Sequence, residues 1–194
     1  VKIGSPHLKT GTMLKGRDSL GEIRCELQVG ENEKISCRFH RKIDRGTDLS
    51  FDSPFVEDAD SVQSCYMDNR LGVWNCLRLA ETLENGAIVF SCWEEHGGGS
   101  VGYLASFLYR EYGLRQALIS DITWITEGVH PGNGVVISLR DSGIPRRVFL
   151  NRIIDIAKTS GVPFQLEVEA SGGSDGNELQ RSPFPFDWCF IGAA

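Results

Sequence analysis

From Asp68 onward the chain alternates between two hydrophobic patterns, and this alternation limits the possible folds more than any other feature. Short apolar runs of strand length are separated by longer segments whose apolar residues recur at helical spacing. An order of this kind predicts an α/β fold with a mainly parallel sheet and helices on its faces. We expect strands over 87–93, 114–125, 134–140 and 164–170, and helices over 68–86, 100–113 and 147–161.

Residues 1–56 follow a different pattern. Two stretches, 22–29 and 34–40, alternate apolar and polar residues and are bounded by glycine and by clusters of Asp, Asn and Ser. Because this is typical of antiparallel strands, we expect a small β domain over 1–56 and an α/β domain over 57–194. The two parts also differ in charge. Residues 1–56 have ten basic and eight acidic side chains, whereas residues 57–194 have ten basic and eighteen acidic ones.

Composition narrows the classes of partner. Hydrophobic residues make up 41% of the 194 residues, enough for a substantial core. The sequence has neither a run of roughly eighteen apolar residues nor an apolar leader, so we expect a cytoplasmic protein without membrane association. The net charge of −6 lies in the second part, where it disfavours nucleic acid and favours cations. Six dispersed cysteines are expected to be free, largely buried thiols.

Carboxylates gather where ligands of parallel sheets bind, beyond the strand ends. Each taken alone is typical of a helix cap or a solvated turn. Around one crevice they would repel one another unless protons or cations neutralised them, which favours a pair of divalent metal ions. One of two adjacent glutamates can then bind metal while the other faces a bound water as general base. Five carboxylates have this placement: Asp68, Glu94, Glu95, Asp121 and Asp175.

Two other motifs suggest different chemistry. Gly97, Gly99 and Gly102 match the G-x-G-x-x-G fingerprint of dinucleotide-binding proteins, but the glutamates just before them would repel a pyrophosphate. Ser174 lies in the G-x-S-x-G pattern of serine hydrolases, but every histidine precedes it, which is the wrong order for the catalytic triad of that fold.

The four tryptophans lie in apolar runs, which favours core packing over a stacking surface: Trp74, Trp93, Trp124 and Trp188.

Six short stretches occur in an order that is found in one known family: 51–55 (FDSPF), 67–72 (MDNRLG), 93–95 (WEE), 119–123 (ISDIT), 162–165 (VPFQ) and 171–175 (SGGSD). In these stretches the chain resembles the M42 family of dinuclear metalloaminopeptidases, the glutamyl and deblocking aminopeptidases. The resemblance implies a three-layer α/β/α catalytic domain of the phosphorylase/hydrolase type. It also implies a small β domain that helps assemble oligomers.

The same resemblance implies a function and a set of site residues. The function is hydrolysis of N-terminal residues of peptides by a water activated by two divalent metal ions, zinc or cobalt. By position, Asp68 resembles the carboxylate that bridges the two metals, and Glu95 and Asp121 resemble terminal ligands. Glu94 resembles the general base. The expected partners are a peptide substrate and further copies of the same chain.

The histidines depart from the family's pattern. The family supplies one histidine ligand before the β domain and one near its C-terminus, and neither has a counterpart in this sequence. His96 adjoins Glu95, but His7, His40 and His130 lie elsewhere. We therefore expect a truncated chain in which both domains are incomplete. The first alternative is a catalytically inactive homologue that serves assembly or peptide binding, and the second is a dinucleotide-binding α/β protein.

Overall fold

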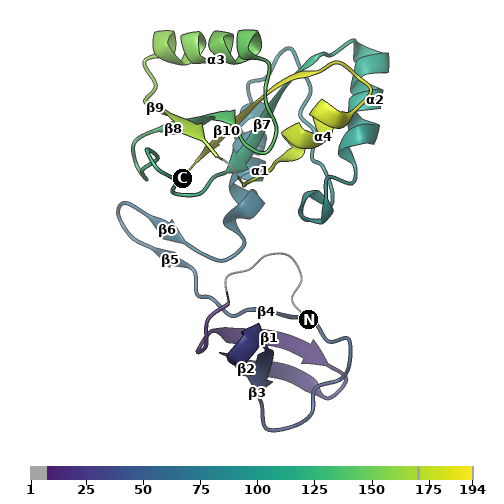
Figure 1. Cartoon of the computed structure of the whole chain (residues 1–194), viewed down its shortest axis with the longest axis vertical. Helices are drawn as coiled ribbons and strands as arrows, with labels where there is room; N and C mark the ends of the chain where they lie inside the picture. The colour runs from purple at the N-terminus through teal and green to yellow at the C-terminus, as the bar shows by residue number, and fades with distance from the viewer. Residues whose placement is uncertain (1–7, 170, 194) are drawn as a thin grey trace. The chain divides into compact units, whose positions relative to one another are not determined.

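The computed structural model describes residues 8–169 and 171–193, and Figure 1 shows the chain. It divides into two compact units, Val1–Tyr66 and Met67–Ala194. The division falls after the change of sequence pattern at residue 56, because a short hairpin belongs to the first unit. This hairpin consists of β5 (Val56–Glu57) and β6 (Val62–Gln63).

The first unit contains an antiparallel sheet with the strand order β3-β2-β1-β4. Alternate residues of β2 are buried, so that Ile23, Cys25 and Leu27 pack with Leu14 of β1 in one core. The antiparallel strands predicted within 22–29 and 34–40 are confirmed. The elements are β1 (Met13–Asp18), β2 (Gly21–Val29), the 3-10 turn η1 (Glu31–Glu33), β3 (Ile35–Arg38) and β4 (Leu49–Phe51).

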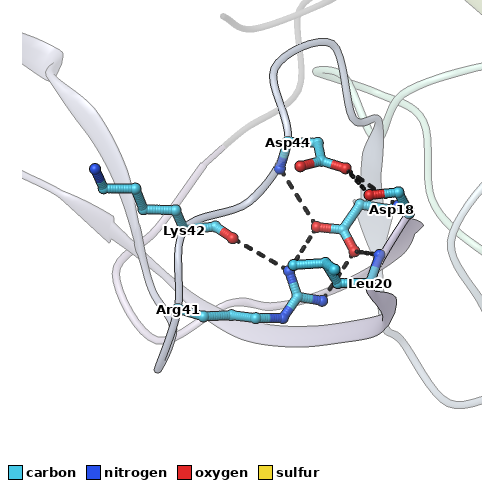
Figure 2. Close-up of polar contacts among 6 residues, drawn as sticks. Asp18, Leu20, Arg41, Lys42 and Asp44 are labelled. Atoms are coloured by element: carbon cyan, nitrogen blue, oxygen red, sulfur yellow. Dashed lines mark hydrogen bonds and ion pairs between the residues drawn. The ribbon is translucent and has the colours of Figure 1, made fainter.

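A polar network joins the turn between β1 and β2 to the loop that precedes β4 (Figure 2). The Arg41 guanidinium donates hydrogen bonds of 2.6 and 2.9 Å to the Asp18 carboxylate. This pairing lowers the pKa of Asp18 to about 2. Asp44 accepts hydrogen bonds from the backbone and the hydroxyl of Ser19, and its own N–H donates to Asp18. The Asp18 side chain is buried whereas Ser19 and Asp44 are exposed, so the network holds the loop to the edge of the sheet at the protein surface.

The second unit contains a four-stranded sheet in the order β7-β10-β8-β9. β10 is parallel to β7 and β8 is parallel to β9, while β10 and β8 are antiparallel, so the mainly parallel sheet predicted for this part is confirmed. The sequence analysis did not predict β10, which lies between β7 and β8. The strands are β7 (Gln116–Ile122), β8 (Val135–Arg140), β9 (Phe164–Val168) and β10 (Asp187–Ala193).

Helices pack against both faces of β10. Trp188 and Phe190 lie in a core with α2 and α4, whereas Cys189 lies in a separate core with α3. Successive residues of a strand point to opposite faces, so one strand supplies both cores. α1 packs against β7. The helices are α1 (Met67–Ala80), α2 (Val101–Tyr112), α3 (Arg147–Ser160) and α4 (Asp175–Arg181), and none in the described residues is long and apolar enough to cross a membrane.

The prediction of a buried strand over 87–93 is wrong, and the helix predicted over 68–86 ends earlier, at Ala80. In the described chain, the backbone hydrogen bonds of 87–93 come from the turn that follows it, and none joins a strand. An apolar run forms a strand only where a neighbouring strand pairs with it. Among the described strands, β7 pairs with β10 alone and leaves its other edge open.

The burial predicted for the tryptophans is correct only for Trp188, which is 2% exposed. Trp74, Trp93 and Trp124 are each more than half exposed. Trp93 belongs to the segment that does not enter the sheet, and Trp124 lies beyond the end of β7. An apolar neighbourhood in the sequence therefore did not place these side chains in the core. The cysteines are free as expected, but only Cys25 and Cys189 are fully buried.

Candidate active site

A cavity of about 60 Å³ in the second unit collects acidic side chains from separate segments of the chain. Three residues predicted from the sequence, Asp68, Glu94 and Asp121, line it together. Glu95 and Asp175 do not line it, although both act electrostatically on Glu94. The lining residues are Asp68, Glu94, Asp121, Ile122, Trp124, Ser138, Asp141, Glu167, Glu169, Gly172, Gly173 and Phe190.

The first turn of α1 places Asp68 beside the end of β7. The Asn69 side chain donates a 2.9 Å hydrogen bond to the Ser120 carbonyl and accepts one of 2.8 Å from the Gly72 N–H. Gly72 is required here, because an added Cβ would lie 2.1 Å from the Ser120 carbonyl oxygen. Asp68 and Asn69 themselves have non-helical backbone angles, so α1 begins irregularly where it carries the carboxylate.

Asp121 lies one residue before the end of β7, in register with Gly192 of β10. Its Oδ1 accepts a 2.8 Å hydrogen bond from the Ile122 N–H. Burial, followed by the charges of Asp68 and Glu94, raises the pKa of Asp121 to about 7. Burial also raises the pKa of Asp68, while a hydrogen bond with Asp121 opposes that rise. The two carboxyl groups are therefore direct neighbours.

Glu94 and Glu95 lie on a 3-10 turn, η2 (Glu94–His96), rather than at the end of a strand. Trp93 and Gly97, on either side of this turn, have left-handed backbone angles. Successive residues of a 3-10 turn point in different directions, so the two carboxylates still separate as the sequence analysis expected, for another geometric reason.

Burial is the main cause of the raised pKa at both glutamates. It raises the pKa of Glu94 to about 7, together with the charges of Asp175 and Glu95. Glu95 has a raised pKa from burial and from Asp68, partly offset by the charge of His96. A carboxylate with a pKa near 7 can both accept and release a proton near neutral pH.

Asp175 begins α4 behind these carboxylates. The Ser91 hydroxyl donates a hydrogen bond to its Oδ2, and its Oδ1 is buried without a hydrogen-bond partner. The charge of Asp175 raises the pKa of both Glu94 and Asp121. The sequence analysis singled out Asp175 by its position after a strand but gave it no role.

A further set of polar residues lines the cavity and was not predicted from the sequence: Ser138, Asp141, Glu167 and Glu169. Asp141 accepts hydrogen bonds from the Gly143 N–H and from the Ser174 hydroxyl, at 2.6 and 2.9 Å. Glu167 is buried and accepts hydrogen bonds from two threonine hydroxyls at its Oε1. Their only sequence signal was the presence of carboxylates within or next to predicted strands.

The two competing motifs have structural explanations. Ser174 caps α4 by accepting a hydrogen bond from the Gly176 N–H, and its hydroxyl donates to Asp141. Its hydroxyl is therefore bonded to a carboxylate and not to the histidine that such a triad requires. Gly97 follows η2, and no strand precedes it in the described residues 81–96. The strand-to-helix context that a dinucleotide fingerprint requires is thus missing.

A family model described as M42 glutamyl aminopeptidase matches residues 1–193. The chain belongs to the M42 peptidase family. No curated protein sequence matches the chain.

Solved structures of M42 fold resemble this one at low sequence identity. An aminopeptidase from the archaeon Desulfurococcus kamchatkensis superimposes with a TM-score of 0.75 at 20% identity, covering 94% of this chain and 60% of its own. A TET aminopeptidase from the marine sediment archaeon Thaumarchaeota archaeon SCGC AB-539-E09 superimposes with a TM-score of 0.76 at 15% identity. The match covers 94% of this chain and 62% of that one. The Pyrococcus horikoshii TET1 peptidase superimposes with a TM-score of 0.66 at 18% identity, and the match covers 98% of this chain and 66% of that one. The chain thus spans less than two thirds of the length of these structures.

M42 membership makes a metal the natural occupant to test against the carboxylates. We call Asp68, Glu94, Glu95 and Asp121 the first acidic group. The charge of Asp68 raises the pKa of each of the other three. A divalent cation relieves repulsion of this kind, and carboxylate oxygens are suitable donors for it.

The side chains of the first acidic group are not yet arranged around a common point, although their carboxylates are suitable metal donors. Across residues 8–169 and 171–193, no three His, Cys, Asp or Glu side chains already surround one point as a metal site. The donor types therefore fit a divalent ion, but the side chains must approach one another, or be joined by further donors, when it binds.

Proposed function

We propose that this M42 chain carries the catalytic carboxylates of a metal-dependent aminopeptidase that removes N-terminal residues from peptides. The observation that carries this proposal is the meeting of Asp68, Glu94 and Asp121 at one cavity. They come from α1, η2 and β7, which are far apart in the sequence. Three carboxylates brought together from separate segments are better explained by a shared ligand than by three independent helix caps.

In this proposal Asp68, Glu95 and Asp121 would hold two divalent ions, zinc or cobalt, and the charge of Asp68 would serve both. Bound there, the ions would polarise the scissile carbonyl and acidify a water molecule. Asp121 lies on the sheet, and the hydrogen bond from Asn69 to the Ser120 carbonyl holds the backbone next to Asp68 beside the end of β7. The backbone thus brings the two carboxylates together, and their side chains can adjust to a bound ion.

Glu94 acts as the general base in this proposal. Its carboxylate lines the cavity, and its half-buried position makes the neutral and charged forms similar in free energy near pH 7. It can therefore take a proton at its carboxylate oxygen and later return it to the leaving amine. The negative charge of Asp175, whose carboxylate accepts a hydrogen bond from Ser91, favours protonation of Glu94.

The test is a peptide digest followed by mass spectrometry, with the protein incubated with Zn²⁺ or Co²⁺. Residues should disappear one at a time from the N-terminus, and the release should stop when the metal is chelated. Cleavage inside the peptide, or no cleavage with either ion, would overturn the proposal. Glu111→Gln provides a control, because this exposed carboxylate of α2 lies outside the cavity.

We also propose that the protein assembles with copies of itself through the region 1–56. Pyrococcus horikoshii TET1, one of the similar structures, can assemble into a tetrahedron or a large octahedral shell. The formal charge of residues 1–56 is +2, whereas that of the remaining chain is −8. Contacts through the nearly neutral part would keep the acidic parts of two copies from repelling one another at close range.

A further inference from the structure

The cavity holds carboxylates for which the proposed mechanism has no use. We call Asp141, Glu167 and Glu169 the second acidic group. Burial, followed by the charges of Glu167 and Asp141, raises the pKa of Glu169. None of the three is among the causes of the raised pKa values in the first acidic group. The charges that act on Glu169 thus come from its own group.

Ser138 is an independent sign that a ligand belongs beside the second acidic group. This serine is 1% exposed, lines the cavity, and has a hydroxyl without a hydrogen-bond partner. It lies opposite Glu167 in the pairing of β8 with β9. Buried hydroxyl groups are nearly always paired, so an unpaired one beside a cavity indicates a partner that occupies the cavity.

The charge of the cavity determines whether that ligand is cationic or anionic. Six carboxylates line the cavity, and its described lining residues include no Lys, Arg or His. When ionised, the four carboxylates of the first acidic group would be neutralised by the two divalent ions proposed there, and the three of the second acidic group would remain without a cation. In addition, no member of the second acidic group forms an ion pair within residues 8–169 and 171–193. A cationic ligand is attracted to this end, whereas a glutamate side chain is repelled.

The size and the walls of the cavity favour a particular cation. A lysine ammonium is a compact charge with three donors, which suits a cavity of about 60 Å³ lined by several carboxylates. Ile122, Trp124 and Phe190 also line the cavity and offer apolar surface. The methylene stem of a lysine can lie along such a surface while its ammonium group reaches the carboxylates.

We propose that Ser138 and the second acidic group bind the side-chain ammonium of a lysine at the N-terminus of the peptide substrate. The inference rests on the proposed aminopeptidase function and names its substrate class. It departs from the glutamyl specificity in the name of the family model, because the carboxylates of this cavity disfavour an acidic side chain.

The first test compares the p-nitroanilides of lysine, norleucine and glutamate as substrates of the metal-loaded protein. Norleucine matches the lysine stem without its charge. We expect kcat/KM for lysine to exceed that for norleucine by about 10- to 100-fold, as for loss of a charged hydrogen bond. Glu167→Gln and Ser138→Ala should each lower kcat/KM for the lysine substrate about tenfold and leave kcat/KM for the norleucine substrate unchanged. The control Glu111→Gln should change kcat/KM for neither substrate. Equal loss on lysine and norleucine would overturn the proposal, because it would assign the group to the backbone α-ammonium.

The second test does not require catalysis. Calorimetry on the metal-free protein compares binding of L-lysinamide with that of L-norleucinamide. Tighter binding of lysinamide, lost in Ser138→Ala, supports the proposal, and equal affinity overturns it. Because Ser138→Ala removes only an unpaired hydroxyl, the variant is expected to fold. If no p-nitroanilide is hydrolysed but lysinamide binds preferentially, the proposed function fails while the ammonium site stands.

Discussion

The contact between α1 and β7 at Gly72 predicts that a single added methyl group disrupts the candidate site. A Cβ at this position would lie 2.1 Å from the Ser120 carbonyl oxygen and 2.2 Å from Asn69 Oδ1. The Ser120 carbonyl accepts the hydrogen bond that attaches α1 to the end of β7, and Asn69 Oδ1 accepts the one from the Gly72 N–H within α1. In Gly72→Ala, α1 must therefore move away from β7 or lose these bonds, and Asp68 at the start of α1 moves with it.

The expected magnitude follows from these contacts. Two lost hydrogen bonds cost about 0.5–1.5 kcal/mol each, and overpacking costs about 1–3 kcal/mol. Replacing glycine by alanine in a helix returns about 1 kcal/mol. We expect the free energy of unfolding to fall by about 3 kcal/mol.

Urea denaturation monitored by circular dichroism measures this loss. The control is Gly102→Ala in α2, where an added Cβ meets no atom within 4 Å. This variant should be as stable as the wild type or slightly more stable, because alanine favours the helix. If Gly72→Ala unfolds at the wild-type midpoint, the close approach of α1 to β7 does not exist and the derived position of Asp68 is wrong.

Four further outcomes are expected. Glu94→Gln should lower peptidase kcat by about 10²- to 10⁴-fold while bound metal, measured by elemental analysis, is retained; parallel loss of metal would contradict its role as base. Asp68→Asn should lower the metal content instead, and a content near two ions per chain would contradict a bridging role. Since Arg41 lowers the pKa of Asp18 from 3.8 to about 2, the resulting stabilisation should be present above pH 3.8 and lost toward pH 2. Arg41→Gln should flatten this part of an acid-unfolding curve. Light scattering at micromolar concentration should show at least a dimer, and a monomer would contradict assembly through 1–56.

Local patterns predicted the elements whose formation depends mainly on their own residues. α2 ends at Tyr112, and Gly113, which follows it, adopts the left-handed angle that glycine favours, close to where the sequence placed the end of the helix. The segment 87–93 and strand β10 show the limit of such patterns. Both are short apolar runs, but β10 finds strands to pair with on both sides and 87–93 finds none in the described chain. Pairing between distant segments decides this difference, and a local pattern does not contain it.

The candidate site was predictable where a carboxylate coincides with the end of an element. Asp68 and Asp121 satisfy that condition, and the structure places them side by side. Glu94 was predicted at a strand end and reaches the cavity from a 3-10 turn instead. Its position depends on the left-handed angles at Trp93 and Gly97, which no hydrophobic pattern reveals. A correct residue was therefore found through a partly incorrect local structure.

The second acidic group escaped prediction because β9 reverses the usual relation between polarity and burial. In the run Leu166-Glu167-Val168, the leucine is 44% exposed and the valine 62%, whereas the glutamate between them is 1% exposed. A pattern that assigns apolar residues to the core therefore places the strand with the wrong face inward. Burying a carboxylate costs free energy unless it is hydrogen-bonded or paired with a cation. Two threonine hydroxyls bond to one oxygen of Glu167, but they supply no positive charge. A cation bound beside Glu167 would supply that charge, and the unpaired hydroxyl of Ser138 on the adjacent strand lies where we propose that it binds.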